Sequence, residues 1–379
     1  MFINDQLDTN KKYYEKMLKV AGSLSNLFSE SKEPYLGYRL VENLFCRSFQ
    51  ADNLSRSDTS IDALKDSIGI GIKTFTYRNG NGYEKIAEFN KELDLFKGLD
   101  SKEKVQKVSE LRNERIDFAQ RTYGLSQMLY HCVARDIGKI VIYETPMAPV
   151  QVDKIGTIVE NRNSIRFSDG LNNYNFNTSK STLYKQFQAK NILMNFPVQI
   201  ISDPFIALEE FFIKNTAQLI FSPIQEIPHV FLPIFSVNKG TNEKYVAEKS
   251  GLNQWNAAGR PRNLNEVYIP IPSLIHKIFP DFFPSRDTKF TLRLPNKSTL
   301  TAKVCQDGSK ALMSDPNADL GQWILRDVLK LKDRELLTYE KLERLGLDAV
   351  VIYKIDKSNY HIDFAKIGSY DEFLQDSQD

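Results

Sequence analysis

Cysteine and histidine, the residues that most often build metal centres, are scarce in this sequence. Its 379 residues include three cysteines and four histidines. Cys46, Cys132 and Cys305 lie far apart and form no CxxC pair, which argues against a zinc site and against a disulfide framework. Such cysteine usage favours a reducing compartment, and we therefore expect a cytoplasmic protein.

Long apolar runs and nucleotide-binding loops are absent as well. No stretch approaches the ~18 apolar residues of a membrane span, and the opening MFINDQLDTNKKYYEKM has no apolar segment of a signal peptide. We therefore expect no membrane segment and no secretion. There is no GxxxxGKS/T loop, and GIGIK at 69–73 matches one only superficially. Because no histidine begins an HxK motif, hydrolysis of the phospholipase-D type, which uses two such motifs, is excluded.

Charge is spread unevenly along the chain. The total is close to neutral, at +2, with 26% charged and 41% apolar residues, as in ordinary globular domains. Residues 239–313, however, hold 12 Lys or Arg against 6 Asp or Glu, a net of +6, whereas residues 314–379 hold 9 against 14, a net of −5. A local basic block of this kind favours a polyanionic partner such as nucleic acid.

The hydrophobic pattern divides the chain into an α/β half and a strand-rich half. The first half is predicted to contain a hairpin within 58–77 turned at Lys65-Asp66-Ser67, a strand at 139–144, a strand meander at 153–188, and helices at 11–29, 36–49, about 83–96, about 101–136 and 204–215. The second half is predicted to contain helices at 273–278 and 319–328 and strands at 229–236, 265–271, 288–294, 300–305 and 349–355. The proline-rich stretch 221–235 separates them, which predicts two domains, 1–224 and 225–379.

The order of elements in the first half resembles the α/β core of PD-(D/E)XK nucleases. In that family an Asp, and an acidic-x-Lys motif on the next strand, bind a divalent metal and position the attacking water, so the resemblance implies Mg²⁺ as cofactor. Asp62 would be the metal ligand and Lys73 would lie near the water. Hairpin geometry places Asp62 opposite Gly71, with Lys73 diagonally within reach. The motif departs from the family at Gly71, where an acidic residue is expected.

Three further acidic residues compete for places in this site. Glu88, on the predicted helix after the hairpin, would replace the acid missing at Gly71 as a catalytic residue and metal ligand. The apolar stripe of that helix points away from Glu88, so a solvated acidic face is the alternative interpretation. Glu42, on the preceding helix, matches a supporting acid that the family often carries. Asp58 would lie on the same face as Asp62 and competes with it.

The segment SGLNQWNAAGRPRNLNEVYIPIP at 250–272 places amide and guanidinium groups on a loop before an edge-strand pattern. With FPDFFPSRDTKFTLRLPNKSTLTAKV and CQDGSKALMSDPNADLGQWIL, it closely resembles the B3-like DNA-recognition domains of restriction enzymes, in particular the module attached C-terminally to some phospholipase-D-type restriction enzymes. The resemblance covers roughly a third of the chain. It implies a mainly-β pseudobarrel that clamps the major groove of double-stranded DNA between two arms, 251–263 and 306–314.

This resemblance also implies a set of DNA contacts. Amide and guanidinium groups of the arms would contact bases or phosphates, and a buried tryptophan would anchor the first arm. The DNA-binding residues expected on the arms are Gln254, Trp255, Asn256, Arg260, Arg262, Asn263, Ser309 and Lys310. Lys180, in FNTSKSTLYKQF at 176–187, is a further candidate for a backbone contact, with a solvated strand edge as the alternative. Trp323, at helical spacing with leucines, is expected in the core.

Together these resemblances predict a type II restriction endonuclease that hydrolyses DNA phosphodiester bonds with Mg²⁺. Since one such active site cuts one strand, double-strand cleavage would need a homodimer or sequential nicking. A cognate DNA methyltransferase is the genetic partner that the family implies. The rival hypothesis is a sequence-specific DNA-binding protein with an inactive nuclease-like first domain, which the glycine at position 71 keeps open. A structure-specific repair nuclease is a third hypothesis, which would not need base-reading arms.

Overall fold

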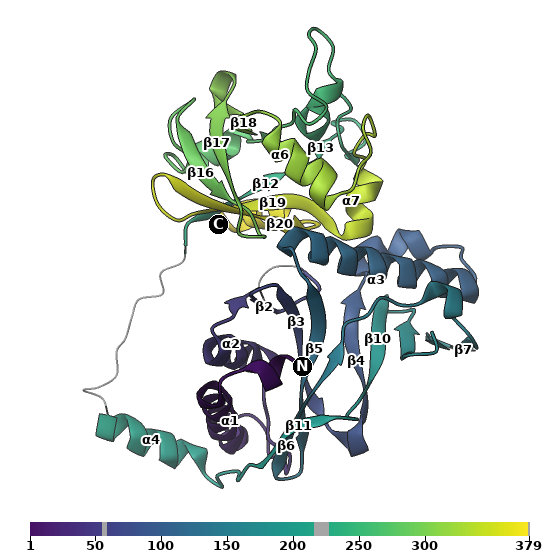
Figure 1. The fold of residues 1–379 in the computed structure, drawn as a ribbon, viewed down its shortest axis with the longest axis vertical. Coiled ribbons are helices and arrows are strands. Elements are labelled where there is room, and N and C mark those ends of the chain that lie inside the picture. The colour runs from purple at the N-terminus through teal and green to yellow at the C-terminus, as the bar shows by residue number, and fades with distance from the viewer. Residues whose placement is uncertain (55–58, 216–226, 378–379) are drawn as a thin grey trace. The chain divides into compact units, whose positions relative to one another are not determined.

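The computed structural model describes residues 1–54, 59–215 and 227–377. Contacts divide the chain into two compact units, both drawn in Figure 1. Unit 1 comprises residues 1–90, 96–113 and 125–224, and unit 2 comprises residues 91–95, 114–124 and 225–379. The predicted boundary near residue 225 lies outside the described residues. The sequence pattern assigns 91–95 and 114–124 to the first domain, whereas their contacts assign them to unit 2.

A mixed six-stranded sheet forms the centre of unit 1, in the order β1-β2-β3-β5-β6-β11. β3 and β5 run parallel, and the other neighbours run antiparallel. The strands are β1 (Asp52–Asn53), β2 (Ala63–Lys65), β3 (Ile68–Thr76), β5 (Gln127–Asp136), β6 (Lys139–Pro146) and β11 (Ile192–Pro197). The hairpin of β2 and β3 and the predicted strand at 139–144 are both confirmed.

Two helices cover one face of this sheet (Figure 1). They are α1 (Asp8–Ser23) and α2 (Tyr38–Phe49), which confirm the helices predicted at 11–29 and 36–49, although α1 ends earlier than predicted. Val41, Phe45 and Phe49 of α2 recur at helical spacing, and all are buried against Ile70 of β3 and Val133 of β5. This apolar cluster fixes the helix that carries Glu42.

A second, antiparallel sheet packs against the opposite face. Its order is β4-β10-β9-β8-β7, with strands β4 (Asn81–Glu88), β7 (Val159–Asn161), β8 (Ser164–Ser168), β9 (Asn173–Asn177) and β10 (Thr182–Gln188), which confirms the predicted meander at 153–188. The rings of Phe75 and Tyr130, from β3 and β5, lie 5.8 and 5.1 Å from the Phe187 ring of β10 between centroids. Unit 1 therefore consists of a helical layer and two sheets. A further helix, α4 (Pro204–Asn215), confirms the helix predicted at 204–215.

Two helix predictions are wrong in whole or in part. Residues 81–88 form strand β4, in which Tyr83 and Lys85 are exposed whereas Gly82, Glu84 and Ile86 are partly buried, an alternation of period two. A short 3-10 segment, η4 (Asn90–Phe96), follows it. Helix α3 (Ser101–Tyr123) ends before Gly124, which has a φ of +64°, and the rest of the helix predicted at 101–136 is β5. The run LYHCVA in β5 is buried on both faces, so its pattern does not separate a strand from a buried helix.

Unit 2 contains a seven-stranded sheet that curls into a nearly closed barrel (Figure 1). Its order is β12-β19-β20-β16-β17-β18-β15, and the end strands β12 and β15 approach each other. The strands are β12 (His229–Pro233), β15 (Ile269–Pro270), β16 (Lys289–Arg293), β17 (Thr299–Cys305), β18 (Ala311–Ser314), β19 (Leu347–Lys354) and β20 (Asn359–Lys366). The predicted strands at 229–236, 288–294, 300–305 and 349–355 are confirmed. Of the strand predicted at 265–271, only Ile269–Pro270 is formed.

Short helices close the barrel of unit 2. They are α5 (Ser273–Ile278), α6 (Asp319–Gly321) with its continuation η9 (Gln322–Val328), α7 (Tyr339–Leu345) and α8 (Ser369–Asp376). The helix predicted at 273–278 is confirmed as α5, and the helix predicted at 319–328 is confirmed as α6 and η9. Trp323 is buried in the core as predicted. Phe118, from the end of α3, packs on Phe364 with ring centroids 5.1 Å apart, which explains why residues 114–124 belong to this unit. Among the described residues, none of the helices has the length and apolar character needed to cross a bilayer.

Candidate functional site

The hairpin of β2 and β3 brings Asp62 into the neighbourhood of Lys73. The turn lies at Asp66-Ser67, as predicted. Asp62 directly precedes β2, and its Oδ2 accepts a hydrogen bond from the Ile72 N–H at 2.7 Å. Burial raises the pKa of Asp62, and among the opposing influences the positive charge of Lys73 is the largest. The two predicted site residues therefore lie within electrostatic reach of each other.

Packing around Gly71 leaves little room for a side chain at the position where the PD-(D/E)XK pattern carries an acidic residue. A Cβ atom at this position would lie 2.7 Å from the Met147 Cε and 3.0 Å from the Tyr130 ring. Contacts of this length require one of the neighbours to shift. An acidic side chain at residue 71 would in addition be surrounded by apolar atoms.

Strand β4 carries a further partly buried carboxylate near Lys73, that of Glu84, for which the sequence predicts no role. Glu84 faces inward, and a Cβ atom on neighbouring Gly82 would lie 3.7 Å from the Phe75 ring and 3.9 Å from Glu84 Oε1. Phe75 follows Lys73 by two residues, so both side chains lie on the same face of β3. Burial raises the pKa of Glu84, and Lys73 is the strongest opposing charge. The alternation in NGYEKIAE is the sequence signal that predicts this inward position.

Lys73 therefore has two carboxylates within electrostatic reach and is bound to neither. Among the residues that the structure describes, its ammonium group forms no ion pair and no side-chain hydrogen bond. No group of three Asp, Glu, His or Cys side chains in the described ranges is arranged to hold a metal ion. Mg²⁺ requires less, because it keeps several waters and binds proteins through one or two carboxylates plus substrate phosphates. Asp62 and Glu84 are the two partly buried carboxylates that have Lys73 as their strongest opposing charge.

The other predicted acids have different surroundings. Glu42 is buried on α2, and its Oε2 lies 3.2 Å from Arg39 NH1. Burial, together with the charges of Glu42 and Asp62, raises the pKa of the Cys46 thiol to about 12, so both acids lie near the same sulfur atom. Glu42 therefore lies at the margin of the site. Asp58 lies outside the described residues.

Glu88 does not lie on a helix, so the helical placement from which its role as a metal ligand was inferred is wrong. It ends strand β4, is exposed, and pairs with Lys85 at 2.7 Å. The pairing of β10 with β4 shifts register between Leu183 and Tyr184, which face Ala87 and Lys85 respectively. Such a bulge reverses the alternation beyond it, so Glu88 does not share the inward face of Glu84.

A buried lysine of the second sheet lies close to this site. Lys185 of β10 is 6% exposed, and its Nζ forms a 3.4 Å hydrogen bond to the Gln186 carbonyl and lies 4.6 Å from the Phe187 ring centroid. Burial lowers the pKa of Lys185. The thiol of Cys132 lies within the electrostatic reach of both Lys185 and Lys73. The two lysines therefore approach one point from two sheets.

His131 was expected on a helix, and the structure places it on β5 instead. Its side chain is fully buried, with Nε2 3.1 Å from the Tyr14 hydroxyl and Nδ1 3.1 Å from Glu144 Oε1. Glu144 also accepts a hydrogen bond from the Ile3 N–H at 3.2 Å. This network ties the first residues of the chain to the sheet. It lies on the helical side, away from the face that carries Lys73.

The first arm of unit 2 starts as a helical turn and continues as a loop. The turn is η7 (Gly251–Asn256), in which Leu252 and Trp255 are buried in the barrel core, as the predicted anchoring role of Trp255 requires. Residues 257–263 have no regular secondary structure. Asn256 donates a hydrogen bond to the Glu248 carbonyl at 3.1 Å, and Asn263 Oδ1 accepts one from the Asn265 N–H at 2.8 Å.

A buried carboxylate, Glu266, holds the polar side chains of this arm. It is 1% exposed and lies just after the loop. Arg260 binds it bidentately, with NH1 3.1 Å from Oε2 and NH2 2.5 Å from Oε1. Gln254 donates to Oε1 at 3.2 Å, and Asn317 donates to Oε2 at 3.0 Å. One carboxylate therefore links the helical turn, the loop and the segment before α6.

The two arginines of the arm differ in what they present to solvent. Arg262 NH1 donates to three loop carbonyls, those of Ala257, Ala258 and Arg260, and its side chain is only 14% exposed. Its guanidinium group therefore shapes the loop. The Arg260 side chain is 55% exposed while it holds Glu266. Of the pair, Arg260 is the one that offers an accessible guanidinium group.

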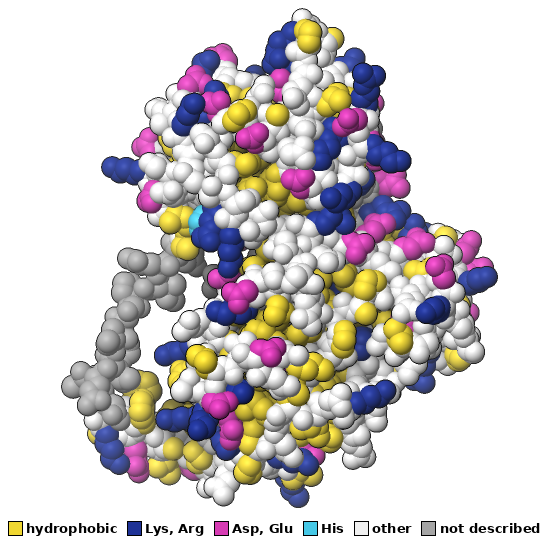
Figure 2. Space-filling view, viewed as in Figure 1, with side chains coloured by type: hydrophobic (Ala, Val, Ile, Leu, Met, Phe, Trp, Pro, Cys, Tyr) yellow, Lys and Arg dark blue, Asp and Glu magenta, His cyan; other side chains and the backbone are white. Residues whose placement is uncertain are grey.

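Half of the predicted second arm belongs to the barrel. Asp307–Ser309 form a short 3-10 turn, η8, and the next residues enter β18. Lys310 is exposed between them, and its carbonyl accepts a hydrogen bond from the Ile271 N–H at 2.8 Å. The Ser309 carbonyl lies 2.9 Å from His276 Nε2. On the face shown in Figure 2, basic and acidic side chains are interspersed over this unit.

Lys180, the candidate outside the arms, is exposed on the turn between β9 and β10. Its N–H donates to Asn177 Oδ1 at 2.9 Å, which fixes the turn but leaves the ammonium group in solvent. The exposed ammonium group fits both interpretations of Lys180, a solvated turn and a contact to the DNA backbone.

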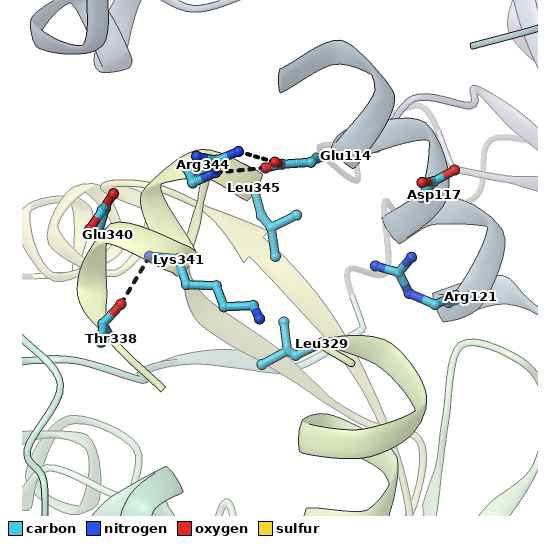
Figure 3. Close-up of a pocket in the computed structure, with 9 residues that line it drawn as sticks. All are labelled: Glu114, Asp117, Arg121, Leu329, Thr338, Glu340, Lys341, Arg344 and Leu345. Atoms are coloured by element: carbon cyan, nitrogen blue, oxygen red, sulfur yellow. Dashed lines mark hydrogen bonds and ion pairs between the residues drawn. The ribbon is translucent and has the colours of Figure 1, made fainter. Parts of the chain in front are cut away.

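Unit 2 also contains a pocket of about 410 Å³, drawn in Figure 3. Glu114 and Arg344 form an ion pair at its rim, with Nε 3.0 Å from Oε2, and Arg121 and Lys341 point into its space. The charged residues that line it are Glu114, Asp117, Arg121, Glu340, Lys341 and Arg344. Their formal charges cancel, and none of the predicted site residues is among them. The pocket therefore indicates no particular ligand.

Comparison with known families finds one match, within unit 2. Residues 228–356 match the model of a family described as the NgoFVII C-terminal B3-like DNA-binding domain. This range contains both arms, Glu266 and most strands of the barrel, and the match agrees with the predicted B3-like pseudobarrel. A search of the curated proteins found no match to the chain. Unit 1 thus lies entirely outside the matched range.

Proposed function

We propose that this chain is a sequence-specific DNA endonuclease of the restriction type. The match of residues 228–356 to a B3-like DNA-binding domain of a restriction enzyme carries the proposal. In this account unit 2 selects the sequence on double-stranded DNA, and unit 1 hydrolyses the phosphodiester bond. A cytoplasmic location and a companion DNA methyltransferase belong to the same proposal.

Recognition would depend on the first arm keeping one shape. Glu266 and Arg262 hold the loop through buried or nearly buried contacts, so little conformational entropy is lost when DNA binds. Arg260 then presents a guanidinium group that suits a guanine edge or a phosphate. Lys310, exposed on the second arm, would contact a phosphate and fix the register.

Hydrolysis is assigned to the neighbourhood of Lys73. Asp62 and Glu84 would hold Mg²⁺, which when bound stabilises the charge that builds on the phosphate. Lys73 carries no counterion among the described residues, so its ammonium group is available to donate hydrogen bonds to the attacking water or to a phosphate oxygen. Asp62 is fixed for this role by the Ile72 N–H.

A second function, sequence-specific binding without cleavage, has an observation in its favour. Gly71 lacks the acidic side chain of the nuclease motif, and the described residues provide no three-ligand metal group. In that case unit 1 would be a nuclease-like platform that cannot hydrolyse DNA.

Digestion of a defined plasmid with and without Mg²⁺ separates these functions. The proposal expects discrete fragments in the presence of Mg²⁺ and none with EDTA. Binding to particular sequences with no cleavage under any divalent ion would support the inactive platform. Cleavage confined to junctions or flaps would support a structure-specific repair nuclease instead.

A further inference from the structure

Arg112, in the part of α3 that belongs to unit 1, is a charged side chain buried without a carboxylate. It is 2% exposed. Its NH1 donates a hydrogen bond to Ser60 Oγ at 2.8 Å, and its NH2 donates one to the Tyr130 hydroxyl at 2.7 Å. Its Nε has no partner among the described residues, and no Asp or Glu of the described ranges forms an ion pair with the guanidinium group. Because burying a charge without an opposite charge is costly, this arrangement indicates a role for the charge beyond packing.

The two hydroxyl groups that Arg112 binds flank the strand that carries Gly71 and Lys73. Ser60 lies just before β2 and Tyr130 lies on β5, and β3 runs between these two strands. The Tyr130 ring would be 3.0 Å from a Cβ atom on Gly71, so Arg112 spans β3 on the face to which a side chain at residue 71 would point. Side chains two residues apart on a strand share a face, and Lys73 therefore lies on this face as well.

The directions of these hydrogen bonds leave the hydroxyl proton of Ser60 available. A guanidinium group only donates, so the oxygen atoms of Ser60 and Tyr130 are acceptors toward Arg112 and each hydroxyl group keeps its own proton. Neither proton has an acceptor among the residues that the structure describes. Tyr130 is 3% exposed, whereas Ser60 is partly exposed and lies two residues before Asp62. Because a hydrogen bond from a cation polarises the hydroxyl group that accepts it, Ser60 is a strong donor to an anion.

We propose that the Ser60 hydroxyl group donates a hydrogen bond to a phosphate oxygen of the DNA backbone, and that Arg112 is the positioning residue that holds it. This inference rests on the proposed function in one respect, because it takes DNA as the ligand of unit 1. Serine hydroxyl groups are common donors to DNA phosphates, which offer only acceptors. The phosphate would also bring the negative charge that the surroundings of Arg112 lack. Lys73, on the same face, would be a second donor to this group.

The test is a double-mutant cycle between the full-length protein and its DNA, measured by binding in EDTA. Duplexes that contain the sequence protected in a footprint each carry one methylphosphonate, in which a neutral methyl group replaces a charged phosphate oxygen. At the contacted phosphate this change should weaken binding to the unaltered chain about tenfold, as expected for the loss of a hydrogen bond to a charged group. It should have little effect on Ser60→Ala, which already lacks the donor. Ser60→Thr keeps the hydroxyl group and should respond like the unaltered chain.

Two further variants separate the hydrogen bond from the fold. Ser67→Ala is the matched control, since Ser67 lies at the turn of the same hairpin and its hydroxyl group bonds Ser126 Oγ at 2.7 Å instead of a guanidinium group. It should leave the methylphosphonate effect unchanged. Arg112→Lys keeps the charge but loses the fork that holds two hydroxyl groups, so the effect at the contacted phosphate should largely disappear. A loss of folded protein would instead weaken the binding of all duplexes alike, and circular dichroism measures it directly.

The proposal is overturned if Ser60→Ala changes the methylphosphonate effect at no position of the footprint. An Arg112→Lys variant that keeps the full effect would overturn the positioning role of Arg112. If that variant does not fold, the comparison of Ser60→Ala with Ser60→Thr still decides whether the hydroxyl group contacts a phosphate. A phosphate effect that depends on Ser60, in a chain that cleaves no DNA with Mg²⁺, would leave this inference standing while the proposed function fails. Discrete fragments without such an effect would do the reverse.

Discussion

Charged side chains are arranged in opposite ways in the first arm of unit 2 and around Lys73 of unit 1. In the arm, Arg260, Arg262 and Gln254 converge on one buried carboxylate, Glu266. Around Lys73, two partly buried carboxylates have raised pKa values, and the lysine forms no ion pair among the described residues. Charged side chains that are paired within the protein stabilise one conformation of the loop that carries them, whereas charged side chains without such a partner are available to bind a ligand. In the proposed function, the first arrangement is the recognition scaffold and the second is the reaction site.

The largest effect is expected from removing the charges around Lys73. Lys73→Ala and Asp62→Asn should abolish cleavage and leave specific DNA binding within a few-fold, because recognition is assigned to the other unit. Asn at position 62 keeps an acceptor for the Ile72 N–H, so loss of activity would report the lost charge rather than a lost fold. Single-turnover cleavage and gel-shift titrations of the same preparations provide the measurement.

The same assay decides between the two glutamates of β4. Glu84→Gln should lose cleavage, whereas Glu88→Gln serves as the matched control and should retain it, because Glu88 is exposed and bound to Lys85. Full activity of the Glu84 variant would show that the second carboxylate lies elsewhere, with Glu42 as the next candidate.

Glu266→Ala should cause the next largest effect, on folding and binding together. It leaves Arg260 and Arg262 without their buried partner, a type of change that costs about 3–5 kcal/mol in stability. Chemical denaturation of the full-length protein measures the free energy of unfolding, and DNA titration measures the loss of affinity. A variant as stable and as specific as the unaltered chain would show that the carboxylate does not hold the arm.

Arg260→Ala should have a smaller effect, confined to binding. If Arg260 reads a guanine edge, specific affinity should fall by about 1–3 kcal/mol and discrimination should relax at one base pair. If it contacts a phosphate, all sequences should bind more weakly and the salt dependence should become shallower. Arg262→Ala should instead lower stability, because Arg262 bonds loop carbonyls. Equal binding by both variants and the unaltered chain would remove the arm from the recognition surface.

The smallest effect is expected at Lys185. Burial lowers its pKa below the ordinary 10.5, so the unfolded chain binds more protons between the folded pKa and that value, and stability should rise with pH across this window. Lys185→Met should remove this rise and increase stability by about 1 kcal/mol at neutral pH. Thermal unfolding of both proteins as a function of pH is the measurement. A less stable Met variant would show that the ammonium group is compensated by its surroundings.

Sequence patterns predict those elements of this chain that alternate between core and solvent. The helices α1 and α2 show the 3.6-residue period, and the turn at Asp66-Ser67 follows from the strands on each side. β5 is buried on both faces and was mistaken for a helix, because burial on all sides removes the period. β4 was missed although its alternation is visible, because the charged residues in YEKIAEFNKE also fit a helix.

The site was predictable only in part for a related reason. Asp62 and Lys73 are separated by one hairpin, so local geometry brings them together. The packing of Tyr130 and Met147 over Gly71 depends on strands far away in the sequence, as does the position of Glu84 relative to Lys73. The role of Glu266 likewise becomes apparent only when its partners at 254, 260 and 317 are brought together by the fold.

One measurement tests most directly whether reaction and recognition lie in different units. The full-length protein and its Lys73→Ala variant are incubated with the same plasmid and Mg²⁺, and binding and cleavage are followed in parallel. The account predicts that the unaltered chain produces discrete fragments, and that the variant protects the same sequence in a footprint but leaves the DNA intact. A variant that cuts at the normal rate, or one that loses the footprint together with cleavage, would contradict it.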